Sequence, residues 1–99
     1  MKIKFRQTGG FVGLVIGCEV NTVLLPADKA ARLQSLVEQS GILQATSKRT
    51  PNAADLLIYD FTIETRDGCH QVSFDDLSLP EPVRPLLEYL QNQARSQFG

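Results

Sequence analysis

The chain has 99 residues, of which 42% are hydrophobic and 21% are charged, and its formal net charge is −1. This length suits one domain over residues 1–99, with enough apolar material for a folded core that needs no cofactor. The charge argues against a nucleic-acid partner, and the absence of a long apolar run argues against a membrane span.

The N-terminal segment alternates polar and apolar residues and predicts a strand over Lys2–Arg6. On such a strand Lys2, Lys4 and Arg6 share one face, which we interpret as solvent-exposed rather than phosphate-binding. The segment lacks the apolar core of a signal peptide, so we expect a cytoplasmic protein.

The next segment is rich in β-branched residues and predicts the second strand of a hairpin, over Phe11–Val20. The reversal between the two strands contains Gly9-Gly10-Phe11, where glycine permits the backbone angles of a tight turn. Gly13 and Gly17 fall inside the second strand and indicate a bulge or a close backbone approach.

From Thr22 the spacing of apolar residues changes from that of a strand. The new spacing predicts a helix that begins near Pro26 and ends at Gly41. Pro26 suits a first helical turn, Asp28 suits the positive end of the helix dipole, and Gly41 is typical of a helix terminus. The apolar stripe expected to face the core consists of Ala30, Leu33, Leu36 and Val37.

A polar segment from Thr46 to Ala54 has no apolar period and predicts a mobile loop. After it, Leu56–Thr65 and Cys69–Phe74 predict two strands joined by a turn at Asp67-Gly68, which is a strong hairpin signal. The second half of the chain therefore contains another antiparallel pair.

The last segment predicts a helix introduced by Pro80 and Pro82, with Pro85 in its first turn, where a missing N–H is tolerated. One face of this helix is apolar and should pack against the sheet. The order ββαββα implies an α+β fold in which two helices pack on a mainly antiparallel four-stranded sheet. The apolar face consists of Val83, Leu86, Leu87, Leu90 and Ala94.

Cysteine and histidine, on which many catalytic sites depend, are scarce. His70 is the only histidine and adjoins Cys69, so strand alternation directs the two side chains to opposite faces. A pairing of His70 with Cys18 across strands stays open, because it depends on the register. We interpret His70 as hydrogen-bonded to a carboxylate or a carbonyl. We interpret the cysteines as buried and reduced, although a disulfide between Cys18 and Cys69 stays open. The pattern favours a protein that is not an enzyme.

The acidic residues do not form a recognisable metal site. Asp75-Asp76 and the pair Asp55 and Asp60 lack the spacing of a calcium loop, and Asp75-Asp76 is predicted in a solvated turn before Leu77. Zinc sites need paired cysteine and histidine spacings that this chain lacks, so any zinc would belong to a partner. We expect neither a metal nor a cofactor.

Three parts of the chain, which together span most of its length, carry a family resemblance. They are Arg6–Leu14; Val20-Asn21-Thr22 with Leu25-Pro26; and Asp55, Tyr59, Asp67–Val72 and Pro80 with Leu86, Leu87 and Leu90. In this order and spacing they resemble the emfourin family, small protein inhibitors of thermolysin-like zinc peptidases. The chain departs from that pattern at Gly41-Ile42-Leu43, where relatives carry an aromatic pair, and in a longer, more basic loop thereafter.

The resemblance implies a protein that plugs the cleft of a thermolysin-like metallopeptidase. Such an enzyme keeps an open coordination position on its zinc and a pocket for bulky aliphatic or aromatic side chains. Two loops are candidates, and in the first the sequence leaves open which leucine faces the core and which faces the partner. Leu25 and Phe11 are equally interpretable as core residues. The candidate partner-binding residues are Asn21, Thr22, Leu24 and Leu25 in the first loop and Gly9, Gly10 and Phe11 in the second.

A second class of function fits the same pattern. A small antiparallel sheet without a catalytic set also describes an interaction module that binds a protein through an exposed sheet edge, with no peptidase target. The oligomeric state is open, and a monomer is favoured.

Overall fold

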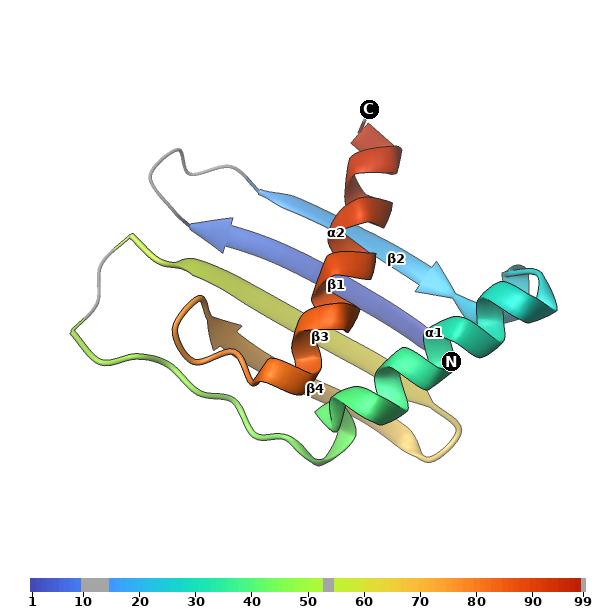
Figure 1. The fold of residues 1–99 in the computed structure, drawn as a ribbon, viewed down its shortest axis with the longest axis horizontal. Coiled ribbons are helices and arrows are strands. Elements are labelled where there is room, and N and C mark those ends of the chain that lie inside the picture. Colours follow the sequence, from blue (N-terminus) through green and yellow to red (C-terminus); the bar gives the residue numbers. More distant parts are fainter. Residues whose placement is uncertain (10–14, 53–54, 99) are drawn as a thin grey trace.

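The computed structural model describes residues 1–9, 15–52 and 55–98, and the side chains as far as residue 94. Its regular elements follow the predicted order of two strands, a helix, two strands and a helix (Figure 1). They are β1 (Lys2–Gly9), β2 (Ile16–Asn21), α1 (Ala27–Ser40), β3 (Leu57–Thr65), β4 (Gly68–Asp75) and α2 (Arg84–Phe98). Short 3₁₀ turns occur at Thr22–Leu24, Ile42–Gln44 and Glu81–Val83.

The four strands form one antiparallel sheet with the spatial order β2-β1-β3-β4. Both helices lie on the same face of this sheet, with α2 crossing the strands and α1 beside it (Figure 1). The opposite face, which we call the outer face, is not covered by either helix. The predicted α+β fold is therefore confirmed.

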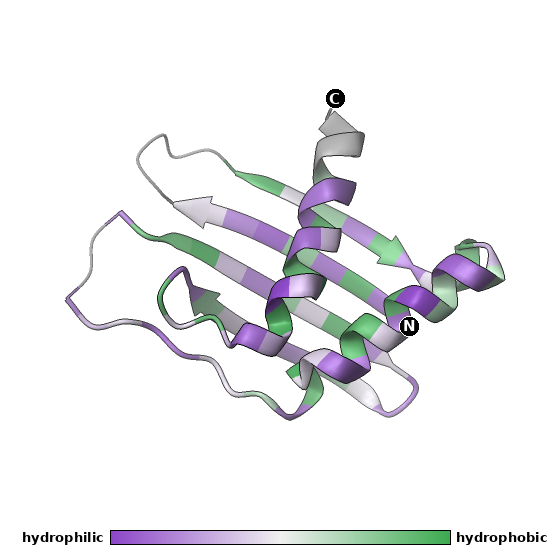
Figure 2. Ribbon diagram, viewed as in Figure 1, coloured by the Kyte–Doolittle hydropathy of each residue, from purple (hydrophilic) through white to green (hydrophobic). Residues whose placement is uncertain are grey.

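Strand alternation places the core on the helical face of the sheet. Ile3 and Phe5 of β1 lie opposite Ile63 and Phe61 of β3, and all four side chains are buried. The Phe5 and Phe61 ring centroids are 5.5 Å apart, within the range of favourable aromatic pairs. Figure 2 shows the corresponding alternation of hydrophobic and hydrophilic residues along the strands.

Helix α1 begins one residue later than the predicted first turn. Pro26 occupies the N-cap position and Asp28 lies in the first turn. Leu33 and Val37 are fully buried, and Gly41 ends the helix with φ +69°, where its N–H donates to the Glu38 carbonyl. This left-handed backbone explains the glycine, because other residues rarely adopt it.

Helix α2 agrees with the prediction in position and in its buried face. Pro85 is its second residue, where no helical hydrogen bond is lost. Val83 belongs to the preceding 3₁₀ turn but is still buried with the helix. The buried face consists of Leu86, Leu87, Leu90 and Ala94.

The hairpins differ from the prediction in their boundaries. β1 extends to Gly9, three residues beyond Arg6, because it pairs with β3 over that length. In the second hairpin Gly68 begins β4, so the turn consists of Arg66 and Asp67. The first part of the predicted strand Phe11–Val20, with Gly13, lies outside the described residues, and β2 begins at Ile16.

Gly17 confirms the predicted close backbone approach. A Cβ added to Gly17 would lie 2.6 Å from the carbonyl oxygen of Phe5, a distance that requires the backbone to shift. The absence of a side chain therefore permits β2 to approach β1 here.

The polar segment after α1 has neither helix nor strand in its described part, residues 46–52, and it lies along the edge of β4. The Lys48 N–H donates to the Ser73 carbonyl at 3.0 Å, and the Ser73 N–H donates to Ser47 Oγ at 2.9 Å. The Thr50 N–H and the Thr50 hydroxyl both donate to the Asp75 carboxylate. The segment is thus tied to β4 by several hydrogen bonds.

Asp75 corrects the prediction of a solvated carboxylate pair. Its side chain is only 2% exposed and accepts hydrogen bonds from Thr50, from the Leu77 N–H at 2.9 Å and from the Ser78 N–H at 2.8 Å. The predicted turn is present, but Thr50, from the segment that lies along β4, covers the Asp75 carboxylate. Asp76 stays exposed and accepts hydrogen bonds from the Tyr59 hydroxyl and the Leu57 N–H.

Candidate functional site

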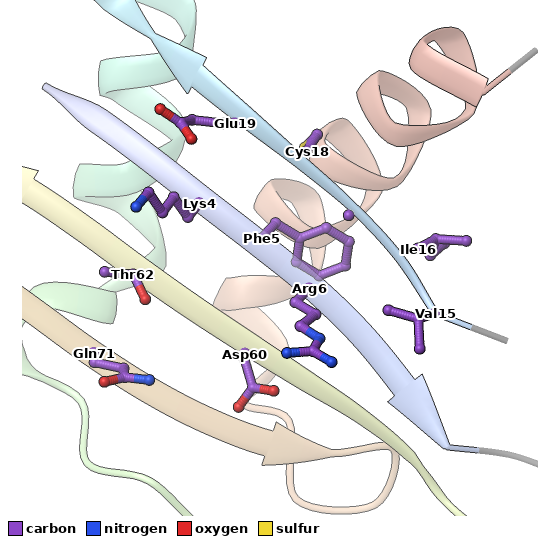
Figure 3. Close-up of a pocket in the computed structure, with 11 residues that line it drawn as sticks. Lys4, Phe5, Arg6, Val15, Ile16, Cys18, Glu19, Asp60, Thr62 and Gln71 are labelled. Carbon is purple, nitrogen blue, oxygen red and sulfur yellow. The ribbon is translucent and has the colours of Figure 1, made fainter. Parts of the chain in front are cut away.

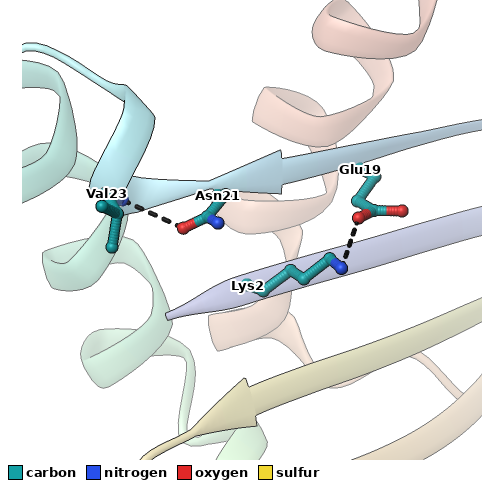
Figure 4. Close-up of polar contacts among 4 residues, drawn as sticks. All are labelled: Lys2, Glu19, Asn21 and Val23. Carbon is teal, nitrogen blue, oxygen red and sulfur yellow. Dashed lines mark hydrogen bonds and ion pairs between the residues drawn. The ribbon is translucent and has the colours of Figure 1, made fainter.

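The first candidate segment forms a short turn between β2 and α1. Residues Thr22–Leu24 adopt one 3₁₀ turn, and the Asn21 side chain accepts a hydrogen bond from the Val23 N–H at 3.1 Å (Figure 4). The Leu25 N–H donates to the Thr22 carbonyl at 3.2 Å and ends the turn. We call residues 21–25 the β2–α1 turn.

The two leucines of this turn have different environments. The Leu24 side chain is 81% exposed, whereas Leu25 is half-buried and packs against the core. Of the two leucines, Leu24 is thus the one that is free to contact a partner.

Val23 belongs to the exposed surface of the turn and was missed by the sequence analysis. Its side chain is 79% exposed, next to Leu24. The available signal was Asn21: an Asn that caps a turn places the following residues outside the strand period, so alternation no longer predicts their burial. The turn therefore presents two adjacent aliphatic side chains.

Thr22 fixes the base of the β2–α1 turn. Its side chain is buried, and both its N–H and its hydroxyl donate to the Met1 carbonyl, at 2.9 Å and 3.1 Å. Nearby, Lys2 of β1 and Glu19 of β2 form an ion pair at 2.8 Å (Figure 4). Asn21 and Thr22 consequently support the turn, while Val23 and Leu24 form its surface.

The second candidate segment lies only partly in the described chain. Gly9 has φ +84°, and a Cβ added there would lie 2.6 Å from the Leu56 carbonyl oxygen. Gly10 and Phe11 lie outside the described residues, so the predicted anchor at Phe11 stays a prediction. Gly9 is at the opposite end of β1 from the β2–α1 turn, roughly 23 Å away at about 3.3 Å per residue. Gly9 and the β2–α1 turn therefore do not belong to one compact site.

The outer face of the sheet carries a shallow hollow of about 600 Å³. Figure 3 shows Lys4 and Arg6 of β1 beside Asp60 and Thr62 of β3 on this face. The expected solvent exposure of Lys4 and Arg6 is confirmed. Because cationic and anionic side chains alternate across the hollow, its charge selects neither an anion nor a cation.

The pairing of His70 with Cys18, which the sequence left open, is excluded by the strand order. Cys18 lies on β2 and His70 on β4, at opposite edges of the sheet. Three strand spacings of about 4.8 Å separate them by roughly 14 Å. His70 Nε2 instead lies 3.1 Å from the Ala45 carbonyl oxygen, as predicted for a bonded strand histidine.

The cysteines are free thiols with different environments. Cys18 is buried, and its thiol donates to the Leu90 carbonyl at 3.4 Å. Burial raises the pKa of this thiol to about 11, which disfavours the reactive thiolate. Cys69 is exposed, which corrects the prediction of burial, because the edge position of β4 leaves its outer-face side chain uncovered.

Neither a metal cluster nor a spanning helix is found in the described chain. No group of three or more histidine, cysteine, aspartate or glutamate residues there is placed to hold a metal ion. Among the helices of the described residues, none combines the length and apolar character that crossing a bilayer requires.

Comparison with known proteins gave one finding. The family model described as Emfourin matches residues 5–91 of the chain. The match includes β2, the β2–α1 turn, both hairpin strands of the second half and the first part of α2. Searches of curated proteins and of solved structures gave no match.

Proposed function

Because this chain belongs to the emfourin family, we propose that it inhibits a thermolysin-like zinc metallopeptidase by placing the β2–α1 turn in the active-site cleft. The family implies a metallopeptidase inhibitor in general terms. The thermolysin-like target, the use of this turn and the residues in contact are our proposal. Asn21 and Thr22 hold the turn, and Leu24 enters a pocket of the cleft.

The observation that carries this proposal is the exposure of Leu24 on a fixed turn. A leucine that is 81% exposed gains about 1.5–3 kcal/mol on complete burial. Because Asn21 and Thr22 already hold the backbone by hydrogen bonds, little conformational entropy is lost on binding. A pocket for aliphatic side chains is the complementary surface.

Hydrogen bonds within the turn would also protect it from cleavage by the peptidase. Hydrolysis requires a substrate backbone that extends along the cleft and places its carbonyl near the zinc. In the β2–α1 turn the Thr22 carbonyl instead accepts from the Leu25 N–H, and Leu25 is held against the core. The turn would then occupy the cleft without adopting an extended, cleavable conformation.

The test compares Leu24→Ala with Leu25→Ala in an inhibition assay against a panel of thermolysin-like peptidases. We expect Leu24→Ala to weaken inhibition about tenfold to a hundredfold, the equivalent of about 1.5–3 kcal/mol, with an unchanged melting temperature. Leu25→Ala serves as the matched control and should lower stability by about 1–3 kcal/mol because it removes a core contact. Undiminished hydrolysis with the unmodified protein across the panel would refute the function itself.

The alternative function is an interaction module without a peptidase target. The specific observation in its favour is the edge strand β2, which within the described residues pairs with β1 alone. Capture of partners from the native cell extract separates the two functions. Recovery of a specific partner that lacks peptidase activity, together with no inhibition of any peptidase, would favour the alternative.

A further inference from the structure

The outer edge of β2 carries unpaired backbone groups next to the β2–α1 turn. The hydrogen bond from the Thr22 N–H to the Met1 carbonyl sets the alternation: the backbone groups of even-numbered residues face β1. Those of Gly17, Glu19 and Asn21 therefore point away from the sheet. Among the described residues, no hydrogen-bond partner is found for these outward groups.

The other edge of the sheet, formed by β4, has hydrogen-bond partners for some of its outward backbone groups. On β4 the outward carbonyl of Ser73 accepts from the Lys48 N–H, and its outward N–H donates to Ser47 Oγ. The outward N–H of Asp75 donates to Ser78 Oγ at 2.9 Å. The chain thus covers this part of β4 with its own segments. Among the described residues β2 has no such cover, and its one charged side chain, Glu19, pairs with Lys2.

Exposed apolar side chains gather at the two ends of β2. Val15, which immediately precedes the strand, is 55% exposed, and Val23 and Leu24 follow its other end. In the described chain, the remaining large apolar side chain with high exposure is Leu77. A ligand that lies along β2 would therefore meet apolar groups at both of its ends.

Helix α2 provides a cover for an added strand. Figure 1 shows that the C-terminal part of α2 crosses β2 and extends past it on the helical face. The thiol of Cys18 reaches the Leu90 carbonyl and marks the crossing point. A strand beside β2 would have the backbone of this part of α2 on its helical face.

We propose that an extended segment of the peptidase partner pairs with the outer edge of β2 as a fifth strand of the sheet. This inference rests on the proposed function. It gives the peptidase a second contact, at the edge of β2, in addition to its contact with the β2–α1 turn. Residues 17–21 offer three outward positions, which match an extended segment of about five residues at about 3.3 Å per residue. A second copy of the chain would bring its own α2 over the joined strands, so a partner that contributes a strand alone fits better.

Amide hydrogen exchange, measured by NMR on the free protein and on its complex with the inhibited peptidase, tests this pairing. Exchange at Gly17, Glu19 and Asn21 should slow at least tenfold in the complex. Cys69 and Gln71, whose outward amides lie on the uncovered part of β4, serve as internal references and should not change. Unchanged exchange at residues 17, 19 and 21 in a complex that still inhibits would overturn the pairing but leave the proposed function intact.

Two other outcomes also decide the matter. In the free protein, exchange at these three amides could instead be slow and become slower as the protein concentration rises. That result would assign the edge to a second copy and overturn the inference. Absence of inhibition of every peptidase in the panel would remove the proposed function and this inference with it. The three results are distinguishable because they come from different measurements: exchange in the complex, exchange in the free protein, and the inhibition assay.

A pair of variants at Glu19 tests the same pairing by affinity. Glu19→Pro removes the outward N–H and places the proline ring at the edge, a position where edge strands tolerate proline. Glu19→Thr is the matched control, since it also loses the ion pair with Lys2 but keeps the N–H. We expect at least tenfold weaker binding for Glu19→Pro than for Glu19→Thr. Equal affinities of the two folded variants would contradict the pairing. If Glu19→Pro does not fold, the hydrogen-exchange experiment provides the test instead.

Discussion

Asp75 shows how one buried carboxylate connects distant segments. Burial by itself would raise the pKa of Asp75, but hydrogen bonds from Thr50, Leu77 and Ser78 outweigh that effect and lower the pKa to about 2. Thr50 precedes the carboxylate by 25 positions. The sequence predicted the turn at Asp75-Asp76 from local composition, but it gave no signal for so distant a partner, and so the burial was missed.

The lowered pKa of Asp75 predicts a loss of stability in acid. The carboxyl has a lower pKa in the folded chain, about 2, than in the unfolded chain, about 3.9. The ionised form thus stabilises the fold above the unfolded pKa, and this contribution is lost as the pH falls from about 5 to about 2. Urea unfolding at several pH values in this range should show a progressively lower midpoint.

Asp75→Asn isolates this contribution. The variant should be less stable at pH 7, because the amide is a weaker acceptor and its NH₂ group meets N–H donors. Between pH 5 and pH 2 it should lose less stability than the unmodified protein. Asp67→Asn, in the exposed turn between β3 and β4, is the control and should keep most of the acid dependence. An acid dependence of Asp75→Asn equal to that of the unmodified protein would contradict the assignment.

At the scale of elements, the β2–α1 turn depends on its cap. The Asn21 side chain accepts the Val23 N–H, so Asn21→Ala leaves that N–H without its partner and should cost about 0.5–1 kcal/mol. We expect a small fall in melting temperature and a weaker inhibition, by several fold, because Val23 and Leu24 are held less firmly.

Asn21→Asp is the matched control for the cap, since its carboxylate still accepts the Val23 N–H. Inhibition by this variant should stay close to that of the unmodified protein. If Asn21→Ala inhibited as strongly as Asn21→Asp, the turn would not need its cap to bind, and preorganisation would have to come from Thr22 alone.

The same turn marks the limit of prediction from local pattern. The helices were predictable because apolar residues recur at the helical period, from Ala30 to Val37 over about two turns and from Val83 to Ala94 over about three turns. A single 3₁₀ turn has no such repeat. Which of Leu24 and Leu25 is buried is set by how the turn packs against the core, and no repeat in the sequence indicates that packing.

At the scale of the whole molecule, the strand order could not be read from the sequence. Alternation identified the strands and the hairpins, but the order β2-β1-β3-β4 depends on β1 pairing with β3, a contact between distant segments. This pairing makes β2 an edge and places Cys18 and His70 at opposite sides of the sheet. The unpaired edge beside the β2–α1 turn is therefore a property of the assembled fold alone.

The assembled fold also separates core residues from contact residues, and Phe61 provides the test. Its ring is completely buried, with the Phe5 centroid at 5.5 Å and the Phe74 centroid at 6.4 Å. Phe61→Ala should lower the free energy of unfolding by about 3–5 kcal/mol, a large part of the total of about 5–15 kcal/mol for such a domain. Leu24→Ala should change it by less than about 0.5 kcal/mol, because Leu24 contacts solvent. Urea unfolding followed by circular dichroism measures both. A loss at Leu24 comparable with that at Phe61 would mean that the β2–α1 turn belongs to the core, and the proposed contact would have to be sought elsewhere on the molecule.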